Sequence, residues 1–235
     1  MSIPKYLQTT SETVAVEETK TFTPHLKLLS ALSKELKKSS DKYIPSAEEG
    51  MFSCDGEVFK KFSFVIMDHS QVYKVWKEGM PIGTFEKEEE AEALASSPDG
   101  IGSEVKLHKD FAIKFIGPDK MAGRNAILSF GRGAKSGKSK MVTAQKLLRE
   151  MGLNFKKSQN KDGVGADITS FVYTYTSELA SSGGNDYWVF KLQEDKQPVY
   201  VSEALYIQAK QDLDDLKALQ VPEDNLLAEG AARGI

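Results

Sequence analysis

Runs of β-branched and aromatic residues, separated by short turns, constrain the fold of this 235-residue chain more than any other feature. The strongest run is Ile168 to Thr176, in which nearly every residue is of these two kinds. After a turn at Ser181 to Asp186, the segment Tyr187 to Leu192 has the composition of a partner strand. Strands that follow one another through tight turns indicate an antiparallel sheet, since parallel strands would need a longer crossover between them.

Further segments have strand character, and two of them flank Asp68-His69-Ser70, where we expect a hairpin turn. A second turn is expected at Asp55-Gly56. The segment that begins at Val105 alternates, and we expect its lysines to form the solvent side of a strand pair. These additional strands are expected at Met51–Ser53, Val58–Met67, Gln71–Lys77, Gly83–Phe85, Val105–Ile116 and Ile127–Phe130.

Four segments have helical character. Thr23-Pro24 is a suitable start for a helix that reaches Leu36, although LKLL within it would also suit a strand. Lys87 to Ala95 is acidic, and a solvated helix explains it better than a metal site because adjacent Glu residues point in different directions. The others run from Lys140 to a stop at Gly152 and from Ser202 to a stop at Pro222. The pattern predicts a β-rich α+β domain, most economically a small open β-barrel with inserted helices and a C-terminal helix.

Charge is distributed unevenly, although the formal net charge is only −3. Residues 194–229 carry a net charge of −6, and residues 101–161 carry +10. A basic middle and an acidic C-terminal segment indicate a polyanionic ligand and a segment that competes with it. The cations of the basic part are Lys106, Lys109, Lys114, Lys120, Arg124, Arg132, Lys135, Lys138, Lys140, Lys146, Arg149, Lys156, Lys157 and Lys161.

The stretch from Ile127 to Lys157 combines a strand, a glycine-rich basic loop and a basic helix, which together form a plausible anion site. Gly137-Lys138-Ser139 suggests a nucleotide-binding P-loop, but its spacing is wrong. The motif requires a glycine five residues before Gly137, and Arg132 occupies that position. The spacing matters because the loop must wrap its backbone N–H groups around a phosphate chain.

Aromatic residues on the expected strands suggest a nucleic-acid ligand. Each is more typical of core than of a ligand platform, but Tyr73 and Tyr175 alternate with small or apolar neighbours and are expected to face outward. Aromatic faces beside a cationic groove suit single-stranded nucleic acid, because every base can stack and every phosphate can be neutralised. The expected contact residues are Lys106, Lys109, Lys114, Arg132, Lys135, Lys138, Lys140, Lys146, Arg149, Lys156, Lys157, Tyr73, Trp76, Tyr173 and Tyr175.

The order of these elements resembles a family of bacteriophage-encoded single-stranded DNA-binding proteins. The resemblance covers residues 22 to 192 and is carried by FTPHLKLLSALSKEL, YIPSAEEGMF, FSFVIMDHSQVYKVW, NAILSFGRGAKSGKSKMVTAQKLL, FVYTYT and YWVFKL. It implies an OB-like β-barrel that coats unwound DNA in phage replication or recombination. Such proteins often end in an acidic tip with a terminal Phe, whereas this chain ends AEGAARGI, so we do not expect a standard tail-borne partner contact.

The expected organisation is a mobile N-terminal arm at residues 1–21, an OB-like domain at 22–193, and an acidic helix and tail at 194–235. Cys54 is the only cysteine, which suits a reducing compartment, and no signal peptide or membrane span is expected. We therefore expect a protein of the host cytoplasm, with homo-oligomerisation left open.

Catalysis has little support in the sequence. His25, His69 and His108 are scattered, and adjacent residues such as Asp68 and His69 face opposite ways on a strand. We expect no cofactor, no metal and no enzymatic activity. Three hypotheses remain: a single-stranded DNA-binding protein, an interaction or scaffolding protein whose basic helix docks on an acidic partner, and a P-loop NTPase, which the spacing disfavours.

Overall fold

The computed structural model describes residues 23–78, 80–131, 137–161, 163–182 and 184–218. The expected N-terminal arm and the end of the acidic C-terminal segment lie outside these residues. The described strands are β1 (His25–Leu28), β2 (Phe52–Cys54), β3 (Glu57–Phe59), β4 (Lys61–Lys77), β5 (Met80–Phe85), β6 (Glu104–Gly117), β7 (Asn125–Gly131), β8 (Val172–Ser182) and β9 (Asn185–Leu192).

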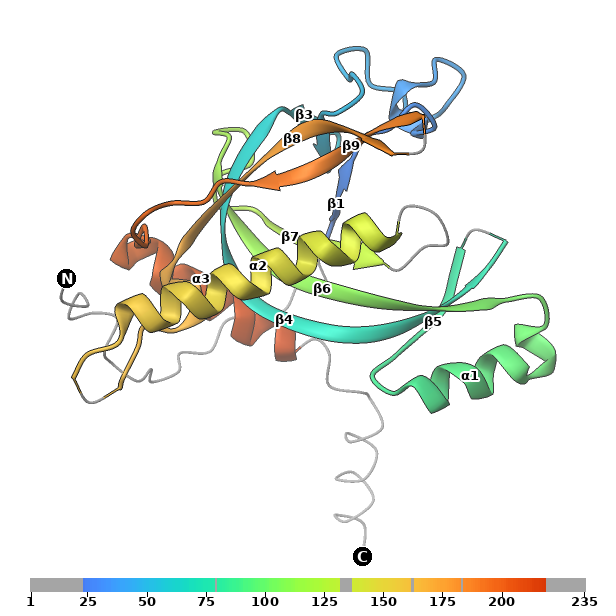
Figure 1. The fold of residues 1–235 in the computed structure, drawn as a ribbon. Helices are drawn as coiled ribbons and strands as arrows, with labels where there is room; N and C mark the ends of the chain where they lie inside the picture. The colour runs from blue at the N-terminus through green and yellow to red at the C-terminus, as the bar shows by residue number, and fades with distance from the viewer. Residues whose placement is uncertain (1–22, 79, 132–136, 162, 183, 219–235) are drawn as a thin grey trace, which may run out of the picture.

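These strands form one sheet in the order β3-β2-β1-β7-β6-β4-β8-β9, with β5 paired to β4. Neighbours are antiparallel except β1 and β7, which run parallel. Figure 1 shows that β4 and β6 are long curved strands that extend from the barrel towards α1 (Glu88–Ser96). One edge of β4 pairs with β6 along most of its length, while its other edge pairs first with β8 and then with β5.

The predicted hairpin around Asp68-His69-Ser70 is wrong, because β4 continues through these residues. Asp68 lies opposite Ala112, and Ser70 lies opposite Asp110. The chain reverses after Lys77, where β5 begins its pairing with β4. The polar triplet marks the point where β4 leaves the core for solvent, since residues 69–71 are exposed, whereas residues 64–67 are buried. The polar residues that suggest a turn therefore mark a change from buried to exposed positions along one continuous strand.

Three α-helices of the described residues cover the sheet, and two helix predictions need correction. The segment after Pro24 forms strand β1 and a short 3-10 turn, η2 (Lys34–Leu36), so the strand alternative for LKLL is confirmed. The basic helix α2 (Gly137–Ser158) continues past Gly152. It continues because Asn154 and Ser158, two and six residues further on, are buried against the rest of the fold. The predicted C-terminal helix is α3 (Glu203–Ala218).

Aromatic rings fill the space inside the curled sheet. Phe62 of β4 lies edge-on to Phe52 of β2 at 4.8 Å and stacks with Phe64 at 5.2 Å between ring centroids. Phe190 of β9 approaches Phe52 at 5.2 Å and Phe130 of β7 at 5.3 Å. Strands near the two edges of the sheet thus meet across one core, although no described ladder joins β3 to β9. The fold is a strand-rich α+β domain whose sheet curls into an open half-barrel.

Candidate nucleic-acid interface

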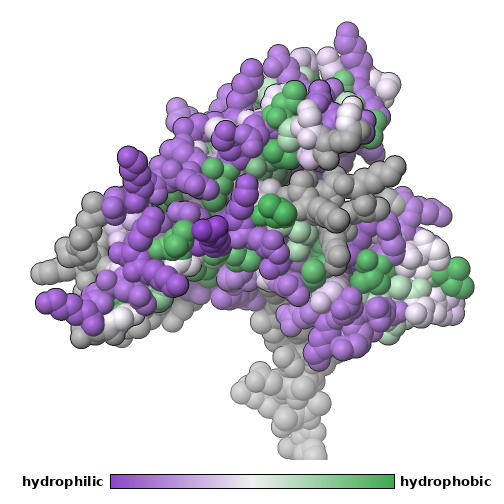
Figure 2. Space-filling model, viewed as in Figure 1, coloured by the Kyte–Doolittle hydropathy of each residue, from purple (hydrophilic) through white to green (hydrophobic). Residues whose placement is uncertain are grey.

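Helix α2 presents one apolar and one basic face. Its apolar face packs against β7 and β9 and buries Ala144, Leu147 and Met151 in the core. Its basic residues are exposed, and the face in view is largely hydrophilic with scattered apolar groups (Figure 2). The exposed cations are Lys140, Lys146, Arg149, Lys156 and Lys157. The prediction that Lys146 and Arg149 lie on the helix face opposite the core residues is therefore confirmed.

These helix cations have no ion-pair partner among the described residues, and the same holds for Lys109 on β6. The Lys157 ammonium donates only to the backbone oxygen of Lys196, at 3.4 Å, and so keeps its full charge. By contrast, acids elsewhere in the fold neutralise much of the remaining basic segment. The pairs are Lys106 with Glu104, Lys114 with Asp212, Lys120 with Glu57, and Arg124 with Asp55. Within the basic segment, the positive charge that lacks an ion pair among the described residues therefore lies mainly on α2.

The prediction that Lys106, Lys109 and Lys114 share a solvent face is wrong in two respects. Lys109 is an odd number of residues from the other two along a regular strand, so its side chain lies on the opposite face of the sheet. Lys114 is fully buried, because α3 covers the outer face at this point and supplies Asp212. Lys114 therefore takes no part in a cationic surface.

The prediction that Tyr175 faces outward is also wrong, and Tyr173 is buried too. Tyr175 lies opposite Phe62 on β4 and Tyr173 lies opposite Phe64, so both tyrosines face the core. Tyr175 is 0% exposed and stacks on Phe64 at 5.6 Å. Burial raises the pKa of both phenols well above the ordinary value. Neither ring is a stacking platform for a base in this conformation.

Tyr73 and Trp76 are half-buried, at the end of β4 that extends from the barrel. Their odd spacing puts them on opposite faces. The Lys106 ammonium lies 5.6 Å from the centroid of the Trp76 ring, a cation–π distance. The Trp76 ring also approaches the imidazole of His108, with 6.0 Å between the ring centroids and nearly parallel planes. Of the four predicted aromatics, Trp76 is the one that combines partial exposure with adjacent positive charge.

A hydrogen-bonded chain of polar side chains crosses the outer face of the sheet beside Trp76. The Lys74 ammonium lies 2.7 Å from Asp110, whose other carboxylate oxygen accepts from the hydroxyl of Ser129. The Ser129 oxygen lies 2.9 Å from His108 Nδ1. The sequence does not identify these residues as a group, because they come from the separate strands β4, β6 and β7. The separation of His108 and Asp110 by two residues was the available signal, since it places both on one face.

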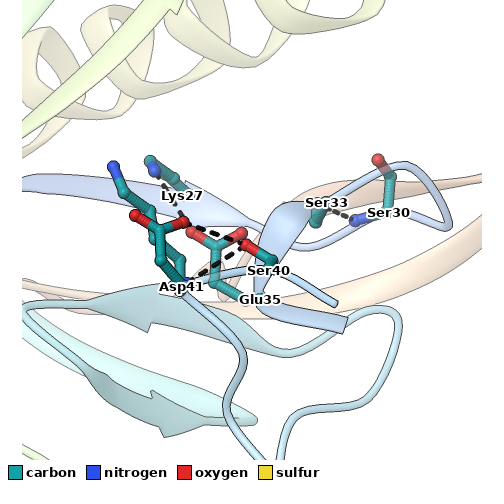
Figure 3. Close-up of polar contacts among 7 residues, drawn as sticks. Lys27, Ser30, Ser33, Glu35, Ser40 and Asp41 are labelled. Carbon is teal, nitrogen blue, oxygen red and sulfur yellow. Dashed lines mark hydrogen bonds and ion pairs between the residues drawn. The ribbon is translucent and has the colours of Figure 1, made fainter. Parts of the chain in front are cut away.

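A cavity of about 370 Å³ lies against the outer side of β1 and β2 and is lined by His25, Lys27 and Glu35 among others. Figure 3 shows Lys27 of β1 reaching Glu35 of η2, 3.1 Å away. Burial alone would raise the pKa of Glu35, but hydrogen bonds from its own backbone and from Lys27 lower it overall. Cys54 also lines this region, and burial raises the pKa of its thiol to about 11. The thiol is therefore a poor nucleophile.

The loop that carries the near-miss P-loop motif falls largely outside the described residues. Arg132 and Lys135 belong to this part, and so does the side chain of Lys138. The described portion of the chain contains no group of three or more side chains suited to a metal ion. No helix within it has the length and apolarity needed to cross a membrane.

Comparison with known proteins places the chain in a phage family. No curated protein matches the sequence, and no solved structure matches it either. A family model described as Pam3 phage gp34-like protein matches residues 3–222, which is nearly the whole chain and includes the sheet, α2 and α3. The chain therefore belongs to the Pam3 phage gp34-like protein family.

Proposed function

We propose that this phage protein binds single-stranded DNA without sequence preference during replication or recombination, and that its half-barrel is an OB-like fold. The observation that carries the proposal is the set of exposed α2 cations that lack an ion pair among the described residues. Because other cations of the basic segment are already neutralised by acids within the fold, the charge left on α2 is available to an external polyanion.

The chemistry of such a surface suits the phosphate backbone. Lys146, Arg149 and Lys156 project from a rigid helix whose opposite face is fixed in the core, so they stay spaced along one surface. Contacts with phosphates position a strand without reading its sequence, and they release counterions. Discrimination of single strands from duplexes needs further contacts with bases, and the half-buried Trp76, beside Lys106, is the aromatic residue proposed to supply them.

A titration followed by fluorescence anisotropy tests the proposal, with labelled oligo-dT and a duplex of equal length as ligands. The wild type should bind oligo-dT more tightly than duplex. The triple variant Lys146→Glu, Arg149→Glu, Lys156→Glu should lose most of this affinity, because it converts attraction into repulsion. The matched control reverses three exposed lysines near η2, in Lys34→Glu, Lys37→Glu and Lys38→Glu, and should bind normally. Equal binding by both triple variants would contradict the proposal.

One observation favours a second candidate, in which α2 docks on an acidic protein. Val142 is 47% exposed and Leu153 is 37% exposed on the basic helix. Apolar groups between cations suit a protein surface, where part of the interface is desolvated. The double variant Val142→Ser, Leu153→Ser separates the two, since it should spare binding to oligo-dT but weaken an interaction with an acidic replication or recombination partner. No comparable observation supports the P-loop NTPase hypothesis. Measured nucleotide hydrolysis would be the evidence in its favour.

A further inference from the structure

Two nitrogen atoms beside the polar chain on the outer face lack hydrogen-bond partners. His108 is 8% exposed, and its Nε2 atom is buried without a partner in the described structure. The indole Nε1 of Trp76 is also buried and unpartnered. Buried polar groups are nearly always satisfied in folded proteins, so two unpartnered nitrogens on adjacent rings are candidate contacts for a ligand or an ordered water.

The hydrogen-bonded chain determines which role each atom plays. Asp110 is held in an ion pair with Lys74 and can only accept, so the single proton of the Ser129 hydroxyl points to it. The Ser129 oxygen must then accept from His108, which places the imidazole proton on Nδ1. The Nε2 atom is left with a free lone pair. Trp76 Nε1 can only donate.

The surroundings keep the imidazole neutral. Burial first, and then the nearby ammonium of Lys74, lowers the pKa of His108 to about 4. At neutral pH the histidine is therefore a hydrogen-bond acceptor and not a cation. Gly131 makes room for it, because a Cβ at this position would lie 2.5 Å from the ring. The site thus offers one acceptor and one donor, beside the ion-paired ammonium groups of Lys74 and Lys106.

We propose that Trp76 and His108 form a nucleobase subsite in which His108 Nε2 accepts from a ring or exocyclic N–H of the base and Trp76 Nε1 donates to an adjacent acceptor. The inference rests on the proposed function and explains how a phosphate-binding protein would choose single strands. Every base carries a donor and an acceptor side by side on its Watson–Crick edge. That edge is free in a single strand and occupied in a duplex.

The test compares oligo-dT with an oligonucleotide of N3-methylthymidine, which keeps the phosphates, sugars and ring faces but lacks the N3–H donor. Wild-type protein should bind oligo-dT about fivefold more tightly, as expected for loss of a hydrogen bond worth about 1 kcal/mol. His108→Phe, which keeps an aromatic ring but removes the acceptor, should bind both oligonucleotides equally. Trp76→Phe should weaken binding to both ligands, because the indole donor is lost. It should keep the preference for oligo-dT, because His108 can still accept from the N3–H of thymine.

Nuclear magnetic resonance of ¹⁵N-labelled histidine provides a readout on the unaltered chain. Adding oligo-dT should shift the His108 Nε2 signal towards a hydrogen-bonded value while Nδ1 stays protonated, and N3-methylthymidine oligonucleotide should leave Nε2 unshifted. If oligo-dT binds through α2 but leaves Nε2 unshifted and both ligands bind equally, the subsite is wrong and the proposed function stands. If no oligonucleotide binds and reversal of the α2 charges has no effect, the proposed function itself fails.

Discussion

The ammonium of Lys114 on β6 lies 2.5 Å from a carboxylate oxygen of Asp212 on α3, and this pair joins the C-terminal helix to the sheet. Lys114 is fully buried and also donates to the backbone oxygen of Gly123 at 2.7 Å. The amide of Asn125 donates to the same Asp212 carboxylate. The acidic segment is thus in part a structural element, since one of its carboxylates is used to neutralise a cation inside the fold.

Asp212→Ala should destabilise the protein by about 3–5 kcal/mol, because it leaves a buried ammonium without its counter-charge. The measurement is chemical denaturation followed by circular dichroism at neutral pH. Asp214→Ala and Asp215→Ala are matched controls on the same helix, and because both side chains are exposed they should each change stability by less than about 0.5 kcal/mol. Lys114→Met in the Asp212→Ala background should restore much of the loss. Equal effects of all three alanine variants would contradict the structural role of the pair.

Binding to single-stranded DNA should weaken steeply with salt. If about five phosphates are neutralised, the plot of log affinity against log salt concentration should have a slope of about −3.5, at roughly −0.7 per contact. Neutralising Lys146, Arg149 and Lys156 to alanine should make the slope shallower by about 2. Anisotropy titrations across a salt series measure both slopes. A salt-independent affinity in the wild type would count against backbone contacts altogether.

The sheet was largely predictable from sequence because its strands are marked by alternation and by β-branched residues. The strand at Ile127–Phe130 and the hairpin at Ser181–Asp186 are present, with modest shifts at their ends. The predicted turn at Asp68 failed because a strand that leaves the core becomes polar without bending. The parallel pairing of β1 with β7 depends on contacts between segments a hundred residues apart, which local patterns do not carry.

The candidate site was predictable only where a single helix determines exposure. The amphipathic period of α2 places Lys146 and Arg149 opposite its core residues, and the structure agrees. Lys114 could not be recognised as buried, because alternation assigns it to the outer face but does not reveal that α3 covers that face. The link between His108 and Ser129 likewise requires the register of β6 against β7.

Stability should fall as the pH is lowered from about 6.5 to about 4, because His108 is held neutral in the folded protein. Burial and the neighbouring Lys74 depress its pKa, so the unfolded chain binds a proton in this range and the folded chain does not. The contribution is fully present above the ordinary histidine pKa and is lost on acidification, by on the order of 2–3 kcal/mol.

Thermal or urea unfolding of the wild type and of His108→Gln between pH 7.5 and 4.5 checks this sign. The variant should be less stable at pH 7, and the difference should shrink as the pH falls, since the variant has no imidazole to protonate. His69→Asn is a matched control, because His69 is exposed on the neighbouring strand. A difference between wild type and His108→Gln that grows on acidification would refute the buried neutral state.

Removal of the chain after Gln220 should raise the affinity for oligo-dT by about 1 kcal/mol or less at low salt, with no difference at high salt. The removed residues include Glu223, Asp224 and Glu229, which share a chain with the basic surface and so benefit from a high effective concentration. The effect should stay small because only three carboxylates are lost, while Asp212 is already engaged by Lys114 and remains in the truncated protein. Parallel titrations of the full and truncated chains at two salt concentrations measure the difference. Weaker binding by the truncated chain would show that this segment supports the DNA site and does not compete with it.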